Sequence, residues 1–174
     1  ALAKVTIPDS VTSIGDHAFC ACDGLTEVTI SGNVASMGQG VFASCKNLTD
    51  VVIQYGIRNI PTSTFSGCSS LTNVTIPESV TSIGDAAFGN CKSLLQLTIP
   101  CSVEDIASRV FSGCNAFLNV DSGNRHYRSV DGALYDKSQT ILYYAGRILT
   151  GKYNVPAGVK IVGDFAFSGK EYLT

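Results

Sequence analysis

The stretch VTIPESVTSIGDAAFGNCKSL, residues 74–94, decides the fold of this chain, because it occurs a second time, nearly unchanged, at residues 5–25. The two copies begin at Val5 and Val74, which are separated by three steps of 23. A fixed internal period in this size range is typical of proteins that stack one structural unit on the next. The sequence therefore predicts a solenoid, in which each unit buries its apolar face against its neighbours.

Cysteine and phenylalanine mark this period most clearly. On the same register, Phe117 takes the position of Leu94, Val120 takes the position of Leu97, and several further apolar positions recur in every unit. Such agreement over five periods is not expected by chance. The recurring residues are Cys22, Cys45, Cys68, Cys91 and Cys114, together with Phe19, Phe42, Phe65, Phe88 and Phe111.

Each unit begins with the pattern of a short strand. Val74 and Ile76 are two residues apart, which is the spacing of a strand with one buried face. Pro77 follows and ends the strand, because proline cannot donate a hydrogen bond to a neighbouring strand. Residues 80–84 then turn the chain back.

The second half of each unit is expected to be a short helical return. Residues 85–91 can form one or two helical turns, with Asp85 as the N-cap and Asp16 and Asp164 in the equivalent positions. The prediction is an α/β-type repeat solenoid of about seven coils. Its parallel β-sheet would form the concave face, with the short helical turns on the other side.

The order of apolar residues resembles that of a leucine-rich repeat. The fuller signature of residues 5–25 and 74–94 is similar to the BspA-type, or treponemal-type, leucine-rich repeat family of bacterial and protist surface proteins. The resemblance covers essentially the whole chain. It implies a curved solenoid, exposure at a cell surface and a role in adhesion or in binding host proteins, and it implies no catalytic residues.

The period is broken once, by an insertion predicted at residues 121–152. The step from Phe111 to Phe167 is one regular period of 23 plus an extra 33, and the strands flanking the insertion are expected near 117–120 and 153–155. Residues 127–135 and 140–144 surround a short polar turn and predict one β-hairpin. Residues 1–2 start in a strand position and residues 170–174 stop as the next strand begins. Residues 1–174 are therefore expected to be a single leucine-rich repeat domain, cut from a longer array.

The charge of the chain excludes several kinds of partner. Lys and Arg number 12 against 14 Asp and Glu, which gives a net charge of −2, and charged residues make up 15% of the chain. This composition offers no electrostatic footprint for nucleic acid or for an anionic membrane surface. No apolar run reaches the roughly 18 residues of a membrane helix, so direct membrane insertion is not expected of these residues.

No catalytic, cofactor-binding or metal-binding residue is predicted. The five repeated cysteines stack one per coil along a line rather than converging on a metal ion, so we expect free thiols in the core. Cys20 and Cys101 lie in variable positions, where exposure is expected, and are too far apart for a disulfide. His17 and His126 are isolated, and a catalytic triad or metal site is not expected. The chain is therefore predicted not to be an enzyme.

The candidate partner-binding residues lie on the strand face and in the insertion. Threonine suits exposed strand positions for structural reasons alone, and the tyrosines equally suit packing of the insertion onto the solenoid, so both alternatives stay open. The candidates on the strand face are Thr26, Glu27, Thr29, Thr49, Asp50, Thr72, Asn73, Thr75, Gln96 and Thr98, and those in the insertion are Tyr143 and Tyr144.

These residues and the family resemblance together predict a non-enzymatic module for protein binding or adhesion, located extracellularly or at the cell surface. Its expected partner is an extracellular protein, such as a host matrix protein or another cell-surface protein, bound on the concave face. One alternative is a structural spacer within a larger surface protein. Another is glycan binding through the tyrosine-rich insertion.

Overall fold

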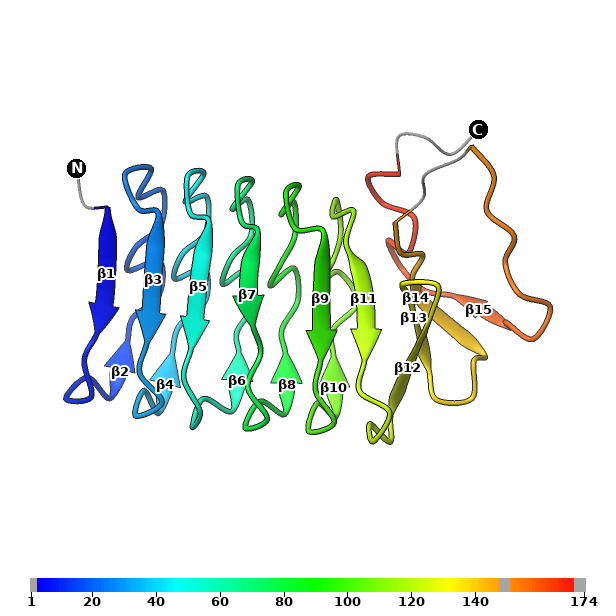
Figure 1. Cartoon of the computed structure of the whole chain (residues 1–174), viewed down its shortest axis with the longest axis horizontal. Helices are drawn as coiled ribbons and strands as arrows, with labels where there is room; N and C mark the ends of the chain where they lie inside the picture. Colours follow the sequence, from blue (N-terminus) through cyan, green and yellow to red (C-terminus); the bar gives the residue numbers. More distant parts are fainter. Residues whose placement is uncertain (1–2, 148–150, 171–174) are drawn as a thin grey trace.

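Each repeat unit folds into one coil, and the coils stack side by side in a row that ends in a differently folded C-terminal part (Figure 1). The structure is a computed structural model and describes residues 3–147 and 151–170. The predicted solenoid is confirmed. Residues 1–2 and 171–174, on which the expectation of a longer array rests, lie outside the described residues.

The main strands are the longer strands, one from each coil, and they run parallel along one side of the solenoid. Their register follows the repeat, since Val28 pairs with Val51 and Val51 pairs with Val74. The inward side chains of Val28 and Ile30 are buried, as the two-residue spacing predicts. We call the outward side of these strands the outer face. In the described part of the chain the main strands are β1 (Lys4–Ile7), β3 (Glu27–Ile30), β5 (Asp50–Ile53), β7 (Asn73–Thr75), β9 (Gln96–Ile99) and β11 (Phe117–Val120).

A second, shorter strand follows the corner of most coils. These strands form two parallel sheets, one of two strands and one of three. The sequence did not predict them, because an alternation of only two residues, such as Ser82 and Ile83, cannot be told from a turn. Within the described residues they are β2 (Ser13–Ile14), β4 (Ser36–Met37), β6 (Asn59–Ile60), β8 (Ser82–Ile83) and β10 (Asp105–Ile106).

The predicted helical turns are wrong. Residues 85–91 and their equivalents form irregular turns, and the described residues contain no helix. In a helix these N–H groups would bond within their own segment, whereas here alternate N–H groups donate to the next coil. Phe42 donates to the carbonyl of Thr64 at 2.9 Å, and Ser44 donates to that of Ser66 at 2.7 Å. The left-handed backbone of Ser44 (φ 60°) and Ser63 (φ 57°) breaks any helical run.

The aspartates predicted as N-caps link neighbouring coils instead. Asp16 Oδ1 accepts the N–H of Gln39 in the next coil at 2.8 Å, and Asp85 Oδ1 accepts that of Arg109 at 3.2 Å. The Arg109 guanidinium also pairs with Asp85, and this holds the pKa of the Asp85 carboxyl below its ordinary value. Asp164 lies in a turn.

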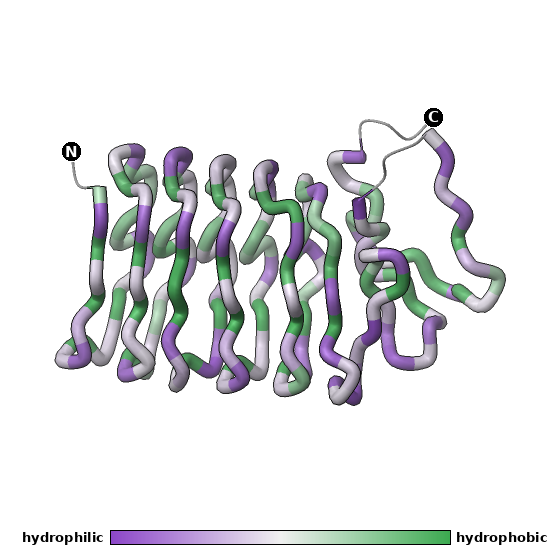
Figure 2. Tube along the Cα trace, in the orientation of Figure 1, coloured by the Kyte–Doolittle hydropathy of each residue, from purple (hydrophilic) through white to green (hydrophobic). Residues whose placement is uncertain are grey.

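Columns of equivalent side chains fill the inside of the solenoid. Consecutive rings from Phe19 to Phe111 stack with centroids 5.3 to 6.0 Å apart. The repeated cysteines are free thiols, as predicted, and all of them except the half-buried Cys22 are buried. Each buried Sγ donates to a phenylalanine carbonyl, for example Cys68 to Phe42 at 3.1 Å. Figure 2 shows the hydrophobic stretches recurring from coil to coil.

Strand β11 departs from the register of the repeat. Leu118 pairs with Leu97 and not with Leu95, the partner that a constant period requires, so the predicted positions of Phe117 and Val120 are wrong. Phe117 is 43% exposed on the outer face. The insertion explains this shift, because Leu118 donates its N–H to the carbonyl of Gly132 at 3.1 Å. Gly132 lies so close to the Phe117 ring that a Cβ atom would be 2.5 Å from it.

The described part of the insertion contains two hairpins rather than one. Strands β12 (Tyr127–Val130), β13 (Ala133–Asp136) and β14 (Ile141–Tyr144) pair antiparallel in that order. The predicted hairpin is present as β13 and β14. The segment predicted as its first arm folds back at Asp131 and Gly132, whose φ angles of 51° and 78° are those of a tight hairpin turn.

Asn124 joins the insertion to the last regular coil. Its side chain is 1% exposed, and its amide donates to the carbonyls of Pro100 and Val103, both at 2.9 Å. Its carbonyl oxygen accepts the N–H groups of His126 at 2.9 Å and Tyr127 at 2.8 Å. A single buried side chain therefore connects the coil to the start of β12.

The repeat resumes after the insertion, with β15 (Ile161–Val162) at the position that β8 holds in the regular coils, but the strand predicted before it is absent. Residues 153–155 form no strand, and β15 instead pairs parallel with β14. The turn at 165–169 stacks on the last return, since the Gly113 N–H donates to the carbonyl of Ser168 at 3.3 Å. Tyr144, and not Phe167, extends the aromatic column beyond Phe111.

Candidate functional site

The outer face carries the ten strand-face residues predicted to contact a partner. Figure 1 shows this face toward the viewer, with no other segment in front of β1 to β9. The structure therefore brings these residues together on one accessible surface. Glu27, Thr72, Asn73, Thr75, Gln96 and Thr98 are exposed, and Thr26, Thr29, Thr49 and Asp50 are half-buried.

A row of threonines runs along the start of the main strands. Thr26, Thr49 and Thr72 each donate a side-chain hydrogen bond to the carbonyl of the preceding coil, at 2.8, 3.0 and 3.2 Å. Their hydroxyls therefore serve the stacking of the coils. Leu95 occupies the next position of the row, cannot donate such a bond, and is 55% exposed.

The next row of the outer face is polar and charged. Lys4 forms an ion pair with Glu27 at 2.8 Å, and this contact raises the pKa of Lys4. Asn73 donates to the carboxylate of Asp50 at 2.7 Å. These exposed contacts link neighbouring coils and leave a face with charges of both signs.

The row of main strands is interrupted between β7 and β9. Strands β1, β3, β5 and β7 form one sheet, and β9 and β11 form another. A groove of about 380 Å³ lies at this interruption. Five predicted residues, Thr72, Asn73, Thr75, Gln96 and Thr98, line it together with Val74, Ile76, Glu78, Leu97, Pro100 and Asp121.

Sequence reasoning missed the charged and structural residues of this groove. Glu78, Pro100 and Asp121 lie at the ends of main strands, where the repeat pattern assigns only corners. Two features of the sequence could have indicated an interruption between β7 and β9. Pro100 has no N–H where Gln54 and Asp121 donate to the preceding coil, and Leu95 interrupts the threonine row.

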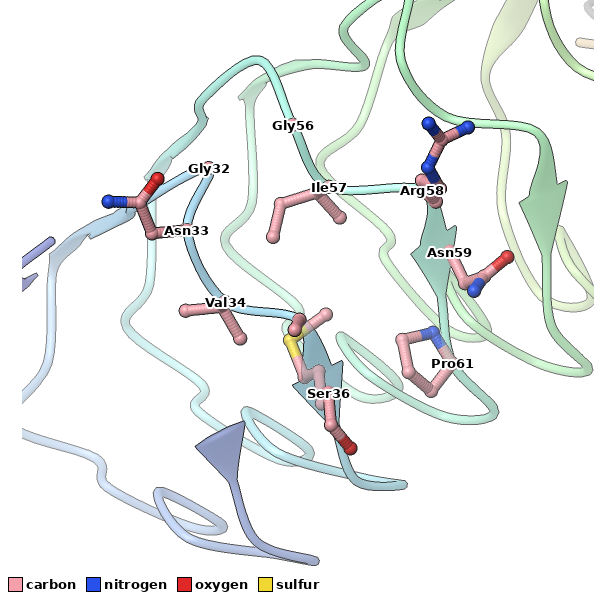
Figure 3. Close-up of a pocket in the computed structure, with 11 residues that line it drawn as sticks. Gly32, Asn33, Val34, Ser36, Gly56, Ile57, Arg58, Asn59 and Pro61 are labelled. Atoms are coloured by element: carbon pink, nitrogen blue, oxygen red, sulfur yellow. The ribbon is translucent and has the colours of Figure 1, made fainter. Parts of the chain in front are cut away.

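A second groove, of about 400 Å³, lies between the shorter strands β4 and β6 (Figure 3). Pro61 explains this second interruption. Gly38, Gly84 and Ala107 occupy the equivalent position and donate their N–H groups to the preceding coil at 2.9, 2.7 and 3.0 Å. Proline has no such donor. Within the part of the chain that the structure describes, Arg58 is the only charged residue that lines this groove.

The tyrosines of the insertion divide into core and surface. Tyr144 is 3% exposed, and its hydroxyl donates to the carbonyl of Ala116 at 3.0 Å. Tyr144 is therefore unavailable to a partner, which corrects its selection as a binding residue. Tyr143 is half-buried and packs edge-on against the ring of Tyr127.

Potential metal ligands and reactive thiols are two further groups among the described residues. No cluster of three or more His, Cys, Asp and Glu side chains in this part of the chain could hold a metal ion. Cys20 and Cys101 are exposed free thiols, as predicted. Cys101 donates to Glu78 at 3.1 Å, and this hydrogen bond raises the pKa of the thiol. Among residues 3–147 and 151–170, no helix has the length and hydropathy of a membrane span.

Comparison with known families gives one match, which covers two thirds of the chain. The model of the BspA type leucine-rich repeat region matches residues 1–117 in six copies. No curated protein matches the chain.

Several solved structures are similar to this one. A leucine-rich repeat protein from Eubacterium ventriosum is 27% identical with a TM-score of 0.83, over 98% of this chain and 46% of that chain. A leucine-rich cell surface protein from Faecalibacterium prausnitzii is 31% identical with a TM-score of 0.70, over 99% of this chain and 53% of that chain. The pneumococcal vaccine antigen PcpA shares the fold at 21% identity, with a TM-score of 0.71, over 99% of this chain and 54% of that chain. This chain thus spans about half the length of each of them.

Proposed function

Because the chain belongs to the BspA-type leucine-rich repeat family, we propose that it is a non-enzymatic protein-binding module of a cell-surface protein, used in adhesion. The outer face of the main strands is its contact surface. The observation that carries this proposal is the accessibility of that face, on which the exposed polar side chains of successive coils lie in register. Repeat arrays engage partners through such extended surfaces.

Two further observations support this proposal. Exposed apolar side chains are interspersed among the polar rows, namely Val52 at 53%, Leu95 at 55% and Phe117 at 43% exposure. Apolar anchors surrounded by polar groups are typical of protein–protein interfaces. The similar structure from F. prausnitzii is described as a cell surface protein, which supports the location.

A binding assay with charged variants tests the proposal. The protein is applied to an array of immobilised extracellular matrix and cell-surface proteins, and saturable binding is measured. Thr29→Lys and Thr75→Lys place long cations on the outer face and are expected to weaken binding at least tenfold. Thr12→Lys is the matched control, because Thr12 is exposed and lies beside β2, away from the outer face.

The same assay decides against the alternatives. Binding that Thr29→Lys and Thr75→Lys leave unchanged contradicts the outer face as the contact surface. The absence of any saturable binding favours a structural spacer. Glycan binding through the insertion would depend on Tyr143, since Tyr144 is buried, and Tyr143→Ala on a glycan array would detect it.

A further inference from the structure

The interruption between β7 and β9 is a feature of the outer face that a simple repeat does not require. Where the strands are paired, the carbonyl of Thr49 accepts the N–H groups of Thr72 and Asn73, both at 3.0 Å. The equivalent donors for the carbonyl of Thr72 are Leu95 and Gln96, and the described structure contains neither bond. The facing edges of β7 and β9 are therefore not paired with each other.

These two edges form the walls of the groove and present free backbone groups to it. In the paired coils, Asp50 donates its N–H to the preceding coil, and parallel pairing uses every second residue of a strand. By equivalence, Val74 directs its N–H and C=O groups into the groove from one wall, and Gln96 and Thr98 do so from the other. Unpaired strand edges are the surfaces to which extended polypeptides add, through backbone hydrogen bonds.

The charges of the groove have one sign. Among the described residues, Glu78 and Asp121 are the only charged ones that line it, and both are carboxylates. Both lie where a main strand has just ended. The Cys101 thiol donates to Glu78 but brings no positive charge. A cation at this end of the groove would therefore be attracted by two carboxylates, without a competing cation in the lining.

We propose that the groove between β7 and β9 binds an extended segment of a partner protein that carries a lysine or an arginine. The backbone of that segment lies along the groove and hydrogen-bonds to the free groups of Gln96 and Thr98 on β9, and its cation lies near Glu78 and Asp121. This inference rests on the proposed function, because it specifies the chemistry of the partner at the outer face. The groove between β4 and β6 provides a contrast, since the charged residue that lines it in the described structure is the cation Arg58.

A titration with two short peptides tests the inference. The probes are the capped pentapeptides Ser-Val-Lys-Val-Ser and Ser-Val-Glu-Val-Ser, whose alternating side chains suit an extended backbone. Binding is followed through the backbone amide signals of Gln96 and Thr98 in NMR spectra and through their hydrogen exchange. We expect the lysine peptide to shift these signals and to slow the exchange of both amides, and the glutamate peptide to bind at least tenfold more weakly.

Isosteric variants locate the charge contribution. Glu78→Gln and Asp121→Asn are each expected to weaken the lysine peptide by up to about fivefold, the range of an exposed ion pair. Glu104→Gln removes an exposed carboxylate that does not line the groove, and is expected to leave the affinity unchanged. Added salt should reduce the difference between the two peptides, because it screens exposed charges.

Two results would overturn the inference: equal affinity for the two peptides, or amide shifts that lie away from β7 and β9. The proposed function is judged separately, with whole proteins. Partner binding that Thr29→Lys abolishes and that Glu78→Gln with Asp121→Asn leaves intact would reject the groove while the outer face stands. If the unmodified protein shows no saturable binding to any whole protein, both the proposed function and the groove inference are rejected.

Discussion

Two positions in the returning half of the coil adopt a left-handed backbone, although most of the residues at these positions are not glycine. In this conformation an L-residue has a steric clash that costs about 1–2 kcal/mol, which glycine avoids. The left-handed backbone allows alternate N–H groups to reach the next coil, so this backbone strain accompanies the stacking of the coils. The first position holds His17, Gly40, Ser63 and Ala86, and the second holds Ala21, Ser44, Gly67, Asn90 and Gly113.

Ala86→Gly is therefore expected to stabilise the protein. The φ of Ala86 is 51°, and glycine would relieve about 0.5–1 kcal/mol of strain after its greater chain entropy is subtracted. Urea unfolding measures the difference. The neighbouring variant Ala87→Gly is the control. It is expected to destabilise the protein, because Ala87 is fully buried and is not left-handed. Equal changes in the free energy of unfolding for the two variants would contradict the claim that Ala86 is strained.

At the scale of the structural element, a proline just after a strand weakens the pairing of that strand with the preceding coil. Pro61 and Pro100 both stand where other coils supply an N–H donor, and each accompanies an interruption. Pro77 removes the equivalent donor between β5 and β7, and there the pairing is shorter but persists. Proline therefore weakens an edge, and the neighbouring residues decide whether the edge opens.

Pro61→Ala restores one donor between β4 and β6. We expect the new N–H to bond to the carbonyl of Met37, as Gly84 bonds to that of Ile60 at 2.7 Å. The added bond is worth about 1 kcal/mol, which the greater entropy of the unfolded chain offsets in part. Hydrogen exchange gives the decisive measurement. Slow exchange at position 61, comparable with Gly84, supports this account, and exchange at the rate of an open loop contradicts it.

The cysteine column makes the array sensitive to alkali. Burial raises the pKa of Cys45 to about 11 and that of Cys68 to about 12, whereas a thiol in the unfolded chain titrates near 8.5. A raised pKa in the folded state contributes stability that is complete below pH ~8.5 and is lost as the pH rises toward the folded value. Between these limits each thiol lowers the free energy of unfolding by about 1.4 kcal/mol per pH unit.

Urea unfolding between pH 8 and 11, in the presence of a reductant, measures this slope. The double variant Cys45→Ala, Cys68→Ala is expected to start less stable and to lose less stability as the pH rises. A slope equal to that of the unmodified protein would show that these two thiols do not control the alkaline transition.

At the scale of the whole molecule, Asn124 determines whether the insertion unfolds together with the coils. Asn124→Ala removes four hydrogen bonds, three of them buried, and is expected to cost at least ~2 kcal/mol. Because solenoids couple only neighbouring units, the loss should separate the insertion from the array. Tyrosine fluorescence reports mainly on the insertion, since the chain has no tryptophan and four of its seven tyrosines lie there. Circular dichroism reports on the coils. We expect the two transitions to coincide before the substitution and to differ after it, and coincidence in the Asn124→Ala variant would contradict this account.

Sequence periodicity predicted the main strands and the core columns of each coil, but it missed the shorter strands, gave helices for the irregular returns, and failed where distant segments meet. The phenylalanine and cysteine columns follow from spacing alone, because equivalent positions of successive coils stack. The shift of β11 depends instead on Gly132 approaching Phe117 from the insertion. The threonine face was predicted residue by residue, while its groove depends on the loss of pairing between two strands. Only Pro100 and Leu95 carried a signal of that loss in advance.

The constant spacing of the contacts between coils also bears on how such a gene can change. Hydrogen bonds from Thr49 to Thr26 and from Thr72 to Thr49 join the same two positions of adjacent units. A duplication or deletion of one whole unit within the regular coils would leave every remaining unit with a neighbour of the same kind. Unequal recombination can therefore lengthen or shorten the array without new compensating mutations. The interrupted pairs are different, because a copy of the unit around Pro100 would carry its groove with it. Duplication of that unit would change the number of grooves as well as the length.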